Sequence, residues 1–363
     1  LVKDINPGTA SRFPSSFSAD QGLLWFRAND GANGYELWRS DGTTAGTSLV
    51  ADIDPSPLGL SSFGSMPRHL TRFGNRVVFF AGTPARGREL WISDGTAAGT
   101  TLVADVVPGP GSSEPLFSAA PVVLGDTIYA ILREASGAFA LFASDGSPAG
   151  TSKVLTTDST GSLAEFVVLT TINDRLVFNA NLGGVGLELW TSDGTAANTE
   201  LLVDATSGGS SFFASILHGD TVAYFTTTDG VDHTVWRTDG TAAGTVLIFA
   251  QTGDPFAGTP VVQATLGDAL IFTTSTPDFG VEPWITDGTP GGTFMLADIA
   301  PGATSSVSFD FVTSGESVYF AVESPPGSLH FQQVWSTDGT SAGTGLVIEL
   351  PSPLAGAGVG NFW

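Results

Sequence analysis

Glu36-Leu37-Trp38-Arg39-Ser40-Asp41-Gly42-Thr43 decides the fold, because close copies of this stretch recur along the whole chain. The Asp of the copies falls at Asp41, Asp94, Asp145, Asp193, Asp239, Asp287 and Asp338. A second Gly-Thr usually follows, as at Gly46-Thr47 and Gly99-Thr100. Self-similarity at a period of about 50 residues is typical of proteins in which each repeat is one supersecondary unit.

A pair of turn-forming residues precedes five of these Asp-Gly units at a constant distance. The pairs are Gly74-Asn75, Gly125-Asp126, Asn173-Asp174, Gly219-Asp220 and Gly267-Asp268. Gly, Asn and Asp tolerate the positive φ that tight hairpin turns require. Each repeat therefore divides into four strands, a to d. In the second copy we expect these strands over Pro67–Phe73, Arg76–Ala81, Glu89–Ser93 and Thr101–Val106.

The b segments are apolar without alternation, as in Val77-Val78-Phe79-Phe80 and Leu176-Val177-Phe178. A continuous apolar run indicates a strand that is buried on both faces. The sequence therefore predicts an all-β fold with residues 1–363 in one closed β-propeller domain of seven four-stranded antiparallel blades. Leu1–Ile5 resembles a d strand, and with seven blades we expect it to close the ring against the last blade. Eight blades is the alternative, in which Leu1–Ile5 and Val359–Trp363 form a partial blade.

The repeated segment resembles the bacterial ELWxxDGT repeat. Departures such as Leu141-Phe142, Pro283-Trp284 and Asp145-Gly146-Ser147 are conservative. The resemblance covers nearly the whole chain. It implies a propeller from a family of mainly secreted or surface proteins of bacteria, and it supplies no catalytic residues.

The residues repeated in most copies are expected to be scaffold. Asp-Gly-Thr suits a turn in which Asp accepts backbone hydrogen bonds, and the repeated Trp suits packing between blades. Glu36, Glu89, Glu188 and Glu282 suit hydrogen bonds that link blades. The acids that end most d strands are Asp4, Asp52, Asp105, Asp204, Asp298 and Glu349. They lack a tight Asp-x-Asp-x-Asp loop, so we predict no metal site, with calcium as the open alternative.

The charge balance excludes several function classes. Asp and Glu number 36 against 13 Lys and Arg, for a net charge of −23 at pH 7. Such a surface repels nucleic acid and anionic membranes, and the apolar runs are too short to span a bilayer. Cysteine is absent, which excludes disulfides and thiolate sites. The opening at Leu1, without Met, indicates a processed chain, and we predict a secreted or cell-surface location.

The functional prediction depends on loop variation. The chain contains no Gly-x-Ser-x-Gly, His-Glu-x-x-His or P-loop, so we predict a protein that is not an enzyme and needs no cofactor. The b–c and d–a loops vary in length and side chains, which favours recognition of an extracellular or surface protein partner on that face. A lectin-like propeller is the alternative, and a polysaccharide-active enzyme with axial carboxylates is the second. The candidate ligand-binding residues are Arg86, Arg88, Phe117, Arg133, Asp278, Phe279, His330 and Phe331.

Overall fold

The computed structural model describes residues 1–7, 14–20, 22–56, 63–114, 120–160, 169–205, 209–252, 260–323 and 332–350. Two compact units, Leu1–Glu200 and Leu201–Trp363, are described separately below. Within the described ranges the regular elements are β-strands, apart from two 3₁₀ turns, η1 (Ala196–Asn198) and η2 (Pro290–Gly292).

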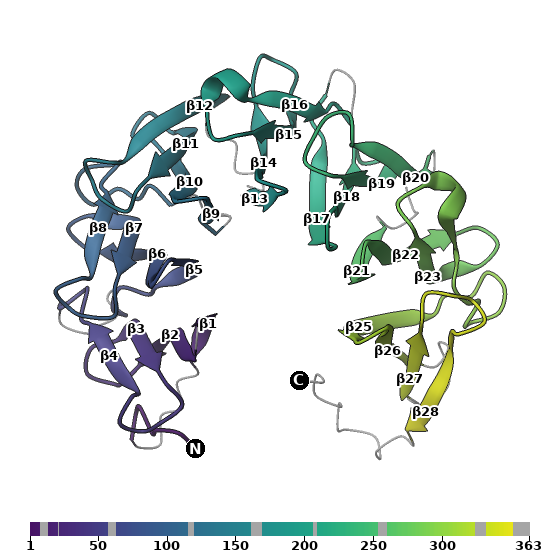
Figure 1. Cartoon of the computed structure of the whole chain (residues 1–363), viewed down its shortest axis with the longest axis horizontal. Coiled ribbons are helices and arrows are strands. Elements are labelled where there is room, and N and C mark those ends of the chain that lie inside the picture. The colour runs from purple at the N-terminus through teal and green to yellow at the C-terminus, as the bar shows by residue number, and fades with distance from the viewer. Residues whose placement is uncertain are drawn as a thin grey trace. The chain divides into compact units, whose positions relative to one another are not determined.

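The first unit carries blades 1 to 4, each a meander of strands a to d in chain order (Figure 1). Blade 1 contains β1 (Ser15–Asp20), β2 (Leu23–Asn29), β3 (Tyr35–Ser40) and β4 (Ser48–Ala51). Blade 2 contains β5 (Arg68–Phe73), β6 (Arg76–Thr83), β7 (Gly87–Ser93) and β8 (Thr101–Ala104). Blade 3 contains β9 (Val122–Leu124), β10 (Thr127–Arg133), β11 (Ala138–Ser144) and β12 (Ser152–Thr160). Blade 4 contains β13 (Leu169–Ile172), β14 (Arg175–Asn181), β15 (Leu187–Ser192) and β16 (Glu200–Val203), which spans the unit boundary.

The second unit carries blades 5 to 7, built in the same way. Blade 5 contains β17 (Phe212–His218), β18 (Ala223–Thr228), β19 (His233–Thr238) and β20 (Val246–Gln251). Blade 6 contains β21 (Val261–Leu266), β22 (Ala269–Thr276), β23 (Gly280–Thr286) and β24 (Thr293–Met295). Blade 7 contains β25 (Val307–Ser314), β26 (Ser317–Glu323), β27 (Gln332–Thr337) and β28 (Gly345–Leu350). The predicted fold class, a β-propeller with seven four-stranded antiparallel blades, is confirmed.

The strand predicted at Leu1–Ile5 is wrong, since these residues form no strand. Hydrogen bonds between this segment and the blade 1 turn, each from a side chain to a backbone carbonyl, hold the segment instead. The Lys3 ammonium donates to the Thr47 carbonyl at 2.6 Å, and the Thr44 hydroxyl donates to the Val2 carbonyl at 2.6 Å. These side-chain bonds take the place of a strand ladder. Val359–Trp363 lies outside the described residues.

The b strands form the core because both of their faces are covered. In β6, Val77, Phe79 and Ala81 pack with blade 1, in a cluster that includes Trp25. The alternate residues Val78 and Phe80 pack with blade 3, in a cluster that includes Ile128, Ala130 and Leu132. The two alternating sets therefore bury opposite faces of one strand, which explains its continuous apolar run.

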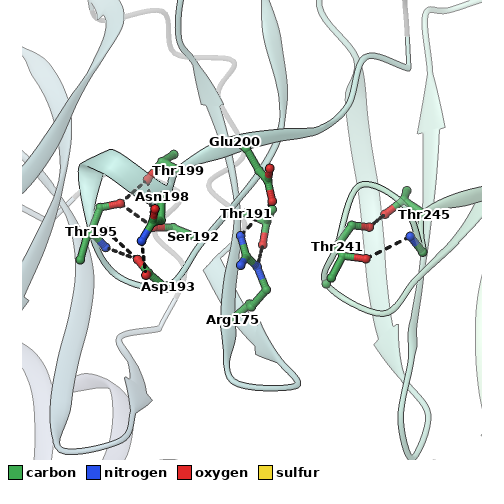
Figure 2. Close-up of polar contacts among 12 residues, drawn as sticks. Arg175, Thr191, Ser192, Asp193, Thr195, Asn198, Thr199, Glu200, Thr241 and Thr245 are labelled. Carbon is green, nitrogen blue, oxygen red and sulfur yellow. Dashed lines mark hydrogen bonds and ion pairs between the residues drawn. The ribbon is translucent and has the colours of Figure 1, made fainter.

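The Asp-Gly-Thr turn is a hydrogen-bonded c–d connection. The Asp94 carboxylate accepts from the backbone N–H of Thr96 at 2.9 Å and from its hydroxyl at 2.7 Å. A Cβ added at Gly99 would lie 2.1 Å from an oxygen of that carboxylate, which explains the second Gly. Blade 4 has Asn198 instead, and its amide donates to Asp193 at 2.6 Å (Figure 2). The turn is scaffold, as predicted.

Candidate functional site

The a strands of blades 1 and 2 each carry a β-bulge, and β1 contacts β5. The strand register shifts between Ser15 and Ser18 in β1 and between Arg68 and Thr71 in β5. Both bulges hold a non-glycine residue in the left-handed region: Ser16 has φ 55° and His69 has φ 54°. Bulges are over-represented next to functional sites because they re-aim side chains.

An open pocket of about 550 Å³ lies at these bulges. Its lining combines cations with apolar side chains: Ser16, Phe17, Arg27, Met66, Arg68, His69 and Leu70. Met66 is a third left-handed residue, with φ 49°. We call these seven residues the basic pocket.

Two guanidinium groups of the basic pocket have no carboxylate partner among the residues that the structure describes. Arg27 donates to the Ser15 hydroxyl at 3.1 Å and 2.7 Å and lies 5.4 Å from the centre of the Tyr35 ring. Burial and the neighbouring Arg68 lower the pKa of Arg27. Within the described ranges, no carboxylate forms an ion pair with Arg27 or Arg68. In a chain with a net charge of −23, this is a local excess of positive charge.

A third guanidinium beside the pocket is neutralised. Arg88 Nε lies 2.8 Å from Oε2 of Glu114, whose side chain is only 5% exposed. Arg88 also donates to the Met66 carbonyl at 2.7 Å and so supports one wall of the pocket. His69 Nε2 lies 3.7 Å from Glu114 Oε1. Burial, with Arg68 and Arg88 nearby, lowers the pKa of His69 below its usual 6.5.

A buried carboxylate in strand c holds the connection that leads to the next blade. In blade 2, Glu89 accepts from the Val106 N–H at 3.2 Å, the Ser113 N–H at 3.1 Å and the Ser113 hydroxyl at 2.5 Å. In the same way, Glu36 binds Ser65 and Glu282 binds Ser306. We call each Glu–Ser pair a carboxylate clamp. The clamps confirm the predicted link between blades for Glu36, Glu89 and Glu282.

The clamp carboxyl groups are fully buried. Burial raises the pKa of Glu36 and of Glu89 to about 7, and the hydrogen bonds that they accept act in the opposite direction. A perturbed carboxyl group can mark a catalytic site. Here backbone N–H groups and a Ser surround the carboxylate, so the clamp is a structural device.

Of the eight residues nominated from sequence, the structure describes five: Arg86, Arg88 and Arg133 in the first unit, and Asp278 and Phe279 in the second. Arg86 forms an ion pair with Asp105 at 3.0 Å, whereas Arg88 turns toward Glu114. Arg133 is exposed in blade 3, and its N–H donates to the Ser113 carbonyl at 2.7 Å. Asp278 and Phe279 are exposed and belong to the second unit. Phe117, His330 and Phe331 lie outside the described residues.

Sequence reasoning missed Arg27, Arg68, His69 and Glu114 as site residues. Arg68 lies in the predicted strand Pro67–Phe73, and no sequence signal there predicts the bulge. The scarcity of bases could have drawn attention to Arg27 and Arg68. Among the residues that the structure describes, no group of three His, Asp or Glu side chains is placed to hold a metal ion, and no helix is long and apolar enough to cross a membrane.

No protein-family model and no curated protein matches the chain. Solved structures do. A prolyl endopeptidase is 13% identical with TM-score 0.49, over 92% of this chain and 49% of that one. A puromycin hydrolase is 16% identical with TM-score 0.44, over 94% and 54%. The β-propeller domain of the Trilobed protease from Pyrococcus furiosus is 12% identical with TM-score 0.42, over 94% and 99%. The chain spans about half the length of the endopeptidase and of the hydrolase.

These comparisons contradict the predicted function, a non-catalytic secreted or surface propeller that recognises a protein partner through its variable loops. The similar chains are an endopeptidase, a hydrolase and a protease propeller domain. The described residues supply a physical reason for the correction. Arg86 of the β6–β7 loop and Arg88 of β7 are paired with Asp105 and Glu114, whereas Arg27 and Arg68 of the basic pocket have no ion-pair partner among the described residues.

Proposed function

We propose that the propeller binds carboxylate-bearing ligands, free peptides in particular, in the basic pocket of blades 1 and 2. The observation that carries the proposal is the pair of guanidinium groups, Arg27 and Arg68, that face one open pocket without a counter-ion among the described residues. A guanidinium presents a planar fork of N–H donors that matches a carboxylate.

The lining of the pocket supports a peptide over a bare inorganic anion. Phe17, Met66 and Leu70 border the cations, and Phe17 is 59% exposed. An exposed aromatic side chain beside a cationic group is suited to a ligand that carries an apolar group next to its carboxylate. The terminal residue of a peptide, with its carboxylate and side chain on one carbon atom, has this chemistry.

The role of the pocket is binding. Arginine stays protonated in proteins, so Arg27 and Arg68 are suited to hold an anion and unsuited to act as a nucleophile or general base. We infer that this chain is the ligand-binding propeller of a hydrolase and that bond cleavage requires residues outside the basic pocket.

Calorimetric titration tests the proposal with acetyl-Ala-Ala-Phe as the free carboxylate and as the C-terminal amide. We expect the carboxylate to bind at least tenfold more tightly than the amide, because a charge-assisted hydrogen bond contributes about 1.5–3 kcal/mol. Arg68→Gln should remove this difference. Arg72→Gln, an exposed arginine in the same strand β5, is the matched control and should preserve it. Equal binding of the two peptides to the unmodified protein refutes the proposal.

A further inference from the structure

Glu114, in the connection after blade 2, lies beside the basic pocket, with Oε1 3.7 Å from Nε2 of the lining residue His69, and its backbone position is fixed. The preceding residue, Ser113, is held by both carboxylate oxygens of Glu89. The Ser113 N–H also donates to the Arg88 carbonyl at 3.0 Å, and the Ser113 carbonyl accepts from the Arg133 N–H at 2.7 Å. The clamp of blade 2 therefore places Glu114 beside the pocket.

The charge of Glu114 changes what the pocket offers to a ligand. Its carboxylate lies 2.8 Å from Arg88 Nε. Burial lowers the pKa of Arg88, Glu114 raises it, and the nearby Arg68 and Arg27 lower it further. Without Glu114, three guanidinium groups would act on the same ligand. With Glu114, Arg88 is neutralised, and Arg27 and Arg68 remain.

The position after the clamp serine differs between blades. Met66 follows Ser65, Glu114 follows Ser113, and Val307 follows Ser306. Met66 lines the basic pocket directly, so two successive clamps deliver residues to one site. Of these three positions, only the one after Ser113 carries a charge. The clamp is therefore a repeated device that presents a variable residue.

We infer that Glu114 is the specificity-determining residue of the basic pocket and selects singly charged carboxylates over dianions. The inference rests on the proposed function, since it concerns the ligand of the same site. The electrostatic interaction scales with the product of the charges. Each added cation in the pocket therefore strengthens the binding of a dianion more than the binding of a monoanion. By neutralising Arg88, Glu114 removes the third positive charge that a dianion would need.

The test compares sulfate, a dianion, with acetyl-Ala-Ala-Phe carboxylate in wild type and in Glu114→Gln. Glutamine keeps the size of the side chain and removes the charge. We expect the ratio of sulfate affinity to peptide affinity to rise on the order of tenfold in the variant. Glu134→Gln, which removes an ion-paired acid in blade 3 at Lys153, is the matched control and should leave the ratio unchanged.

Arg88→Gln provides a second variant with the opposite sign. It removes the Arg88 guanidinium and keeps the Glu114 carboxylate beside the pocket, so the sulfate-to-peptide ratio should fall by a similar factor. Suppose that wild type binds the carboxylate peptide and that Arg68→Gln weakens this binding. An unchanged sulfate-to-peptide ratio in either folded variant then overturns the inference about Glu114 and leaves the proposed function standing. Failure of wild type to prefer the carboxylate peptide over its amide overturns the proposed function as well.

Discussion

Glu36→Gln should change how the stability of the protein depends on pH. The Glu36 carboxyl group is fully buried. It accepts from the Ser65 N–H at 2.7 Å and hydroxyl at 2.5 Å, and from the N–H groups of Ile53 and Asp54 at 3.2 and 3.3 Å. Burial raises its pKa from 4.5 to about 7. Between these two values the folded state binds a proton more tightly than the unfolded chain does.

The sign and size of the effect follow from linkage. A raised carboxyl pKa contributes stability that is fully present below pH 4.5 and is lost as the pH rises through 7. One pKa unit corresponds to about 1.4 kcal/mol, so the contribution of Glu36 is about 3 kcal/mol. Glutamine does not titrate and retains one acceptor oxygen. The free energy of unfolding of wild type minus that of Glu36→Gln should therefore fall by about 3 kcal/mol between pH 4.5 and 7.5.

Urea unfolding and amide hydrogen exchange of Asp54 and Ser65 measure this difference. Exchange reports the opening of the clamped connection even where the two units unfold separately. Glu316→Gln, at an exposed glutamate in the β25–β26 turn, is the control. A difference that stays constant from pH 4.5 to 7.5 refutes the reasoning. Blade 7 carries Gln333 at the corresponding position of its c strand, where the amide oxygen accepts from Trp335 Nε1 at 2.9 Å, so an amide is compatible with a blade.

Two further predictions concern the turn and the pocket. Gly99→Ala should lower the free energy of unfolding by about 2 kcal/mol in urea, because its Cβ would lie 2.1 Å from an Asp94 carboxylate oxygen. Gly291→Ala, at a turn glycine with no positive φ and nothing within 4 Å of the added Cβ, controls for the general cost of replacing a turn glycine, and equal losses would contradict the steric argument. His69 should strengthen binding of the carboxylate peptide several-fold as the pH falls from 7 to 5, because its lowered pKa keeps it neutral at pH 7 and protonation adds a positive charge to the pocket. Calorimetric titration of His69→Gln with the same peptide should lack this rise in affinity, and a rise that persists would assign the effect to another group.

The strands could be predicted because seven copies repeat the same signals. In blade 2 the expected b strand over Arg76–Ala81 corresponds to β6 over Arg76–Thr83, and the expected c strand over Glu89–Ser93 corresponds to β7 over Gly87–Ser93. The turn glycines, the apolar run and the Asp-Gly-Thr reinforce one another at each repeat. A family resemblance to ELWxxDGT repeats stays a prediction, as does a secreted or surface location.

The site was harder to predict because its signals are local. Ser16, Met66 and His69 have positive φ, and of these residue types only His is enriched in that conformation. A single His is too weak a signal to locate a bulge, and Ser16 and Met66 give none. The clamp serines had a weak signal: Ser113 follows Glu89 by 24 residues, and Ser306 follows Glu282 by the same distance. The longer interval from Glu36 to Ser65 hides this regularity.

Repetition and function are connected through the clamps. A buried Glu costs desolvation energy, and the backbone N–H groups and Ser that it binds offset that cost. The same hydrogen bonds fix the residue after the Ser in the connection to the next blade. A substitution at that residue changes the ligand site without touching the clamp, as the difference between Met66 and Glu114 illustrates. A binding site built on clamped connections can therefore change its charge one blade at a time while the blades that carry it stay the same.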